Sequence, residues 1–85
     1  MNVKFTKDEY SCLIEKGFLP EHLFASVREA RKIGDFFSLE LSDGIADEVR
    51  DICGEHLQET GFDEDYNLND KGKVLESLVD KLFIG

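Results

Sequence analysis

The sequence predicts a mainly α fold: a compact four-helix single domain covering residues 1–85. Three observations support this prediction. Apolar residues recur at helical spacing in four segments of the chain. Residues typical of helix caps or helix stops lie at the ends of those segments. An apolar content of 41%, with seven phenylalanines, is sufficient for one hydrophobic core in 85 residues.

The first helix is expected to begin at Thr6. Thr6 and Glu9 have the spacing of a capping box, in which each side chain accepts a hydrogen bond from a free backbone N–H of the first turn. An apolar stripe follows at Tyr10, Leu13 and Ile14. Gly17 is placed to end this helix in the left-handed conformation.

A second helix is expected from about Pro20 to Gly34. The fixed φ of Pro20 suits a helix start, and the buried face would consist of Leu23, Phe24, Val27 and Ala30. Basic residues crowd the expected last turn, where cations complement the helix dipole; they are Arg28, Arg31 and Lys32.

Residues 35–41 alternate apolar and polar side chains, which is typical of a strand. Only Val3 and Phe5 offer a partner, so a short two-stranded ribbon from about residues 2–5 and 36–41 is one interpretation. Because a lone ribbon is weak, an extended connection packed on the helices fits equally well.

The third helix is the clearest amphipathic helix. Ser42 or Asp43 is expected to cap it, and Gly61 to end it after Thr60. Phe62 is expected to make the hydrophobic contact of a Schellman-type cap. The expected buried face spans an arc of about 140° around the helix axis and consists of Ile45, Val49, Ile52, Cys53 and Leu57.

Asn69 is expected to cap the last helix. Its apolar seam has heptad-like spacing and comprises Val74, Leu75, Leu78, Val79, Leu82 and Phe83. So apolar a final turn implies that this end is docked, either on this chain or on another copy. A homodimer through the seam at residues 74–83 is therefore one alternative.

Acidic residues concentrate between Asp43 and Asp65, where Arg50 is the lone basic residue. This stretch accounts for about −8 of the formal net charge of −9. Five of the nine acids recur every fourth residue and would form one stripe on a helix. The predicted partner-binding residues are Asp43, Asp47, Glu48, Asp51, Glu55, Glu59, Asp63, Glu64 and Asp65.

The net charge of −9 disfavours nucleic acid and anionic membranes as partners, because both require clustered Lys and Arg. No apolar run approaches the length of a membrane span, and the polar start does not match a secretory signal. Cys12 and Cys53 are expected to be reduced core residues of a cytoplasmic protein, although the sequence leaves open whether they pair.

Two metal patterns are incomplete. Residues 65–76 place Asp65, Asn67, Asn69 and Glu76 at calcium-loop positions, but Asp70 stands where the loop needs glycine. An acidic loop ending in a helix cap is the favoured interpretation. Cys53 and His56 could supply two zinc ligands of the three or four required, but the remaining candidates, Cys12 and His22, are isolated. No metal or cofactor is expected.

No nucleophile or carboxylate pair has the context that catalysis needs, so we expect no enzymatic activity. The leading hypothesis is a non-catalytic module that binds a basic protein through the acidic segment at about residues 43–65. One concrete version is a small inhibitor of the bacterial immunity or antitoxin type. The alternatives are a self-associating structural domain and a metal-binding domain.

Overall fold

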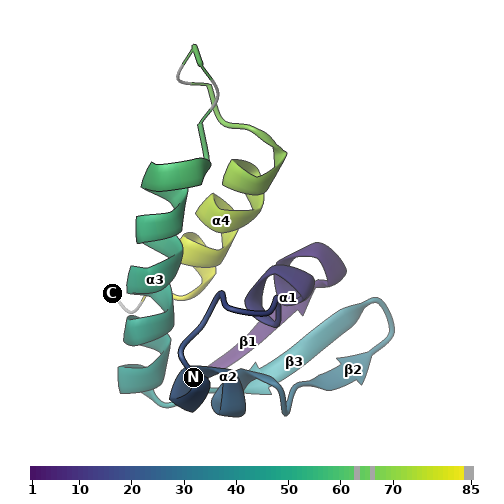
Figure 1. The fold of residues 1–85 in the computed structure, drawn as a ribbon. Helices are drawn as coiled ribbons and strands as arrows, with labels where there is room; N and C mark the ends of the chain where they lie inside the picture. Colours follow the sequence, from purple (N-terminus) through teal and green to yellow (C-terminus); the bar gives the residue numbers. More distant parts are fainter. Residues whose placement is uncertain (63, 66, 84–85) are drawn as a thin grey trace.

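The computed structural model describes residues 1–62, 64–65 and 67–83, and in them four helices accompany a three-stranded antiparallel sheet (Figure 1). The expectation of a mainly α protein with at most a short ribbon is therefore wrong, and the fold is α+β. The elements are β1 (Asn2–Thr6), α1 (Lys7–Leu13), α2 (Glu21–Val27), β2 (Arg31–Ile33), β3 (Phe36–Glu40), α3 (Asp43–Thr60) and α4 (Asp70–Lys81).

The sheet has the order β1-β3-β2, so the expected ribbon gains a third strand. This strand, β2, occupies the residues predicted to end the second helix, and α2 stops at Val27 instead. The reason is a β-hairpin. Ile33 pairs directly with Phe36, and Gly34, at φ 60°, takes the first position of the two-residue loop, where a positive φ favours glycine.

The capping box of α1 is confirmed. The Thr6 side chain accepts from the Glu9 amide at 3.2 Å, and a Glu9 carboxylate oxygen accepts from the Thr6 amide at 2.7 Å. The helix is shorter than expected because its last turn is capped at Ile14. Gly17 does adopt a left-handed conformation, at φ 83°, but in the loop beyond the helix end.

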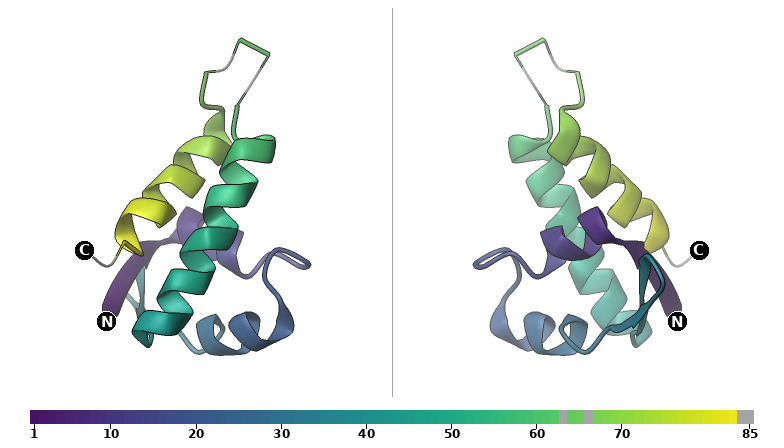
Figure 2. Two further views of the ribbon diagram at one scale, coloured as in Figure 1. Left: turned by 90° about the vertical axis from the view of Figure 1, so that its left-hand side faces the viewer. Right: turned by 90° about the vertical axis from the view of Figure 1, so that its right-hand side faces the viewer.

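The helices α3 and α4 pack side by side and carry the predicted caps (Figure 2). Ser42 caps α3, and Asn69 caps α4 by accepting from the Gly72 amide at 2.7 Å. The predicted Schellman-type cap is wrong, because Gly61 has φ −85° and Phe62 stays exposed. The two helix ends instead approach closely at two glycines: a Cβ on Gly61 would lie 2.5 Å from the Leu57 carbonyl oxygen and 3.2 Å from Gly72 Cα, and a Cβ on Gly72 would lie 2.1 Å from the Gly61 carbonyl oxygen.

The core lies where the inner face of the sheet, α1 and α2 meet the α3–α4 pair. Its largest fully buried side chains are Phe5, Leu13, Leu23, Leu75, Leu78, Leu82, Val27, Val49 and Cys53. The predicted seam of α4 thus belongs largely to the core of this chain, although Phe83 remains 63% exposed. The free edge of β1 is partly closed by Lys81, whose Nζ donates to the Lys4 carbonyl oxygen at 3.0 Å.

Candidate functional site

The predicted acidic residues of α3 all lie on one exposed side of that helix. We call this side the acidic face and define it as Asp43, Asp47, Glu48, Asp51, Glu55 and Glu59. Among the described elements, none covers the outer side of α3, which is nearest the viewer in the left panel of Figure 2. Glu64 and Asp65 continue the exposed acidic surface beyond the helix. The remaining predicted residue, Asp63, lies outside the described residues.

The opposite side of α3 fixes this orientation. Ala46, Val49 and Cys53 are fully buried against the rest of the protein. Because residues three and four positions apart share one side of a helix, burial of this group turns the acidic residues toward solvent. The acidic face is therefore a direct consequence of the amphipathic pattern.

Few cations oppose the charge of the acidic face. Arg50 Nη2 lies 2.7 Å from Asp47 Oδ1 and 3.8 Å from Asp51 Oδ1. His22 Nε2, on α2, lies 3.6 Å from Glu48 Oε1. Within the described part of the chain, Asp43, Glu55 and Glu59 have no ion pair. The six carboxylates and one arginine of α3 leave a formal charge of −5 on this helix.

A hollow of about 380 Å³ lies beside the acidic face, toward α4. Its lining combines carboxylates and one guanidinium with apolar and amide groups; the residues are Arg50, Asp51, Gly54, Glu55, Gln58 and Val79. Close to it, the Arg50 guanidinium lies 5.6 Å from the centre of the exposed Phe83 ring. The acidic face is thus bordered by a recess and an exposed aromatic ring, and aromatic residues are enriched at protein interfaces.

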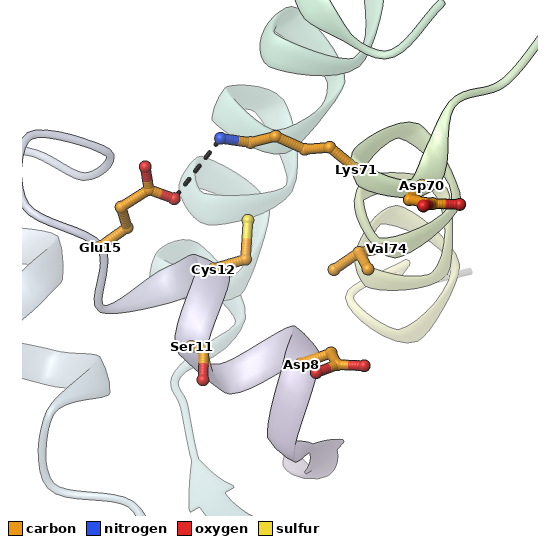
Figure 3. Close-up of a pocket in the computed structure, with 7 residues that line it drawn as sticks. All are labelled: Asp8, Ser11, Cys12, Glu15, Asp70, Lys71 and Val74. Atoms are coloured by element: carbon orange, nitrogen blue, oxygen red, sulfur yellow. Dashed lines mark hydrogen bonds and ion pairs between the residues drawn. The ribbon is translucent and has the colours of Figure 1, made fainter.

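A separate cleft of about 360 Å³ lies between α1 and α4 (Figure 3). An ion pair crosses it, with Lys71 Nζ 3.4 Å from Glu15 Oε2, and Cys12 lies below this pair. Burial raises the pKa of the Cys12 thiol, despite the opposing effect of Lys71. A nucleophilic cysteine needs a lowered pKa instead. The geometry therefore does not activate this thiol.

Asn69, Cys53 and His56, from the two metal patterns, have structural roles in the fold. Asn69 caps α4 and also donates from Nδ2 to the Thr60 carbonyl oxygen at 2.8 Å. The buried thiol of Cys53 has a pKa raised to about 12 by burial, and His56 stacks on Phe18 with ring centroids 4.5 Å apart. Among the residues described by the structure, no group of three or more His, Cys, Asp or Glu side chains could hold a metal ion. Both cysteines are free thiols.

The sequence did not predict that the Glu9 carboxylate is buried. The Glu9 side chain is only 4% exposed; Oε1 accepts from Lys81 Nζ at 2.6 Å, and Oε2 accepts from the Ser77 hydroxyl. Burial alone would raise the pKa of Glu9, but these hydrogen bonds, the Thr6 amide and the charge of Lys81 together hold it below its ordinary value. The spacing of Thr6 and Glu9 predicted only the capping box. With all its oxygens bonded inside the protein, Glu9 is a structural tie.

Comparison with protein-family models, curated proteins and solved structures yields no match for this chain. Within the described residues, no helix is long and apolar enough to cross a membrane.

Proposed function

We propose that this protein is a non-catalytic binding module whose acidic face engages a basic protein. The observation that carries the proposal is the exposed set of six α3 carboxylates, opposed by only Arg50 and His22 within the described structure. Complementary charge accelerates encounter and selects a partner of opposite sign. The cytoplasm is the compartment we propose, because both cysteines are free thiols.

The energetics of α3 support a role for the charge. Like charges four residues apart each destabilise a helix by a few tenths of a kcal/mol, so the four steps of the stripe together cost about 1 kcal/mol when unscreened. Near the end of the helix, Glu55 and Glu59 also oppose the helix dipole. Cations of a basic partner would offset this repulsion between the carboxylates of α3 and would themselves be attracted to them.

The recess beside the acidic face supports a specific mode of contact. Interfaces usually concentrate their binding energy in a few anchors that fill pockets inside a polar rim. Here Val79 and Gly54 line the recess together with Asp51, Glu55 and Arg50, so one negative charge remains in excess at the recess. A long basic side chain, with an apolar stem and a charged head, matches this combination. A small inhibitor that covers a cationic site is the concrete form of the proposal.

The test is capture of basic proteins from the native cell extract on the immobilised protein at low salt. A salt gradient should release the partner, whose affinity is then measured with the purified protein. Replacing Asp47, Asp51 and Glu55 together by Asn, Asn and Gln should weaken binding about tenfold or more, because the charge pairs are lost.

A matched control keeps the same change in net charge. Replacing Asp8, Glu29 and Glu40 by Asn, Gln and Gln also removes three exposed carboxylates, but from α1, the segment after α2 and β3, and leaves α3 and α4 unchanged. This variant should bind almost as tightly as the natural chain. Equal affinity of both triple variants would refute a role for the acidic face.

The two alternatives have less support. Self-association through the seam at residues 74–83 would have to rely on its exposed remainder, chiefly Phe83, because Leu75, Leu78 and Leu82 are already buried. Metal binding predicts that added calcium or zinc raises the melting temperature and that EDTA lowers it. Thermal melts with each additive test that alternative directly.

A further inference from the structure

Unpaired cations gather on the side of the protein that carries the β2–β3 hairpin. Arg28 follows α2, and Arg31 and Lys32 lie on β2; all three are exposed. None of them forms an ion pair with any residue that the structure describes. Together with the exposed apolar residues Ile33 and Phe36, we call these residues the hairpin surface.

The apolar part of the hairpin surface is a cross-strand pair. Ile33 and Phe36 lie directly opposite each other in the β2–β3 register, so their side chains share one face of the sheet. They are 53% and 48% exposed. Arg31 lies on the same face, two residues from Ile33 along β2. This face of the sheet thus presents an uncovered apolar pair beside one cation, Arg31, while Lys32 lies on the opposite face. Glu29 and Glu40 line the same hollow as Arg31, so the positive charge is confined to the hairpin end.

The acidic face has the complementary composition. Its Asp43, Glu55 and Glu59 have no ion pair within the described structure, and Phe83 is exposed beside Arg50. Figure 1 places the hairpin and α3 on opposite sides of the molecule. The two surfaces therefore cannot pair within one chain. They can pair between two chains.

We propose that a second copy of this chain docks its hairpin surface onto the acidic face, head to tail. The proposal rests on the proposed function in one respect, since it uses the same acidic face as the contact surface for positively charged groups, here those of the hairpin surface of a second copy. Such a contact joins two different surfaces, so the dimer keeps one free hairpin surface on one copy and one free acidic face on the other. Assembly then continues beyond the dimer unless the contact closes into a ring.

The charges set the strength of this contact. Glu29 and Asp35 lie among the three cations of the hairpin segment, which leaves residues 28–36 at +1 against −5 on α3. The whole chain, at −9, repels its copies at long range. The attraction between the two surfaces is therefore short-ranged. We expect association only at high protein concentration and at moderate salt, where the Debye length is about 10 Å.

The test is light scattering after size exclusion, from about 10 to about 500 µM protein in about 0.1 M salt. The mean mass should rise with concentration. Arg31→Glu, which blocks the hairpin surface, and Asp51→Lys, which blocks the acidic face, should each weaken association at least about tenfold. Lys73→Glu changes an exposed cation on α4 and should leave association unchanged.

An equimolar mixture of the two blocked variants is the decisive sample. Arg31→Glu retains an intact acidic face and Asp51→Lys an intact hairpin surface, so the mixture should regain the association that each variant alone has lost. A natural chain that stays monomeric throughout, or a mixture that stays monomeric while the natural chain associates, overturns the proposal. Circular dichroism confirms that each variant is folded.

The outcome is separable from that of the proposed function. Loss of self-association with intact capture of a basic protein removes only the head-to-tail contact. Self-association that Asp51→Lys abolishes supports the contact even when the extract yields no other partner.

Discussion

Substitution of Gly72 by alanine tests the contact that joins α3 to α4. A Cβ at this position would lie 2.1 Å from the Gly61 carbonyl oxygen and 2.9 Å from its carbonyl carbon. Ordinary contacts begin at 3.4 Å, so the two helix ends would have to separate by roughly 1 Å. Both obstructing atoms are backbone atoms, which cannot swing aside as a flexible side chain can.

The expected cost combines three contributions. Overpacking of this kind costs about 1–3 kcal/mol. The same Gly61 oxygen accepts from the Asn69 amide at 2.9 Å, and loss of that hydrogen bond adds about 1 kcal/mol. In the opposite direction, the higher helix propensity of alanine stabilises the folded state by up to about 1 kcal/mol relative to glycine. Gly72→Ala should therefore destabilise the protein by about 1–3 kcal/mol.

Gly54 provides a matched control within α3. A Cβ there would meet nothing within 4 Å, so Gly54→Ala should show only the favourable helix term, up to about 1 kcal/mol. Thermal unfolding followed by circular dichroism measures both variants. For a domain of this size 1 kcal/mol corresponds to about 4–8 °C, so the two melting temperatures should shift in opposite directions. A Gly72→Ala protein at least as stable as the natural one would refute the close helix contact.

Three further predictions concern buried groups. Glu9→Gln should cost about 2 kcal/mol in urea unfolding at neutral pH, less than for a fully buried pair because Lys81 is one-third exposed. The folded state lowers the pKa of Glu9 from its ordinary value of 4.5, so the stabilisation by the carboxylate is complete above that pH and declines as the pH falls below it. If the difference in unfolding free energy between the natural protein and Glu9→Gln is the same at pH 3 as at neutral pH, the carboxylate does not have this role. Tyr10→Phe should cost about 1–2 kcal/mol in the same assay, because the tyrosine hydroxyl donates to the Val27 carbonyl oxygen at 2.9 Å; a neutral substitution contradicts that bond. Cys53, fully buried with a pKa raised to about 12, should react with a thiol reagent only on unfolding, so labelling of the native protein at pH 8 within minutes contradicts its burial.

Local chemistry made the helix starts predictable. The caps at Thr6, Ser42 and Asn69 depend on side chains that bond backbone groups two or three residues away, and all three are confirmed. The acidic face was predictable for a similar reason, because the positions of Val49 and Cys53 determine which side of α3 meets solvent.

Strand pairing explains the main error. Residues 31–33 carry the cations that suit a helix end, yet they form β2 because β3 offers a partner across a two-residue turn. The Gly34-Asp35 pair is a local hairpin signal, and it outweighs the dipole argument. The alternation at residues 35–41 allowed a ribbon with residues 2–5 but did not decide for it over an extended connection, because the pairing of Val3 with Leu39 joins residues far apart in sequence. The bond from Lys81 to Glu9 follows from no local pattern for the same reason.

The position of Lys81 has a consequence for how the protein opens. Its Nζ binds both Lys4 and Glu9, so the last helix is tied to the first strand and the first helix across more than 70 residues of sequence. If α4 detached on its own, the Glu9 carboxylate would lose two side-chain donors while remaining inside the fold. The last helix and the first strand should therefore exchange their amide hydrogens together, as one cooperative unit.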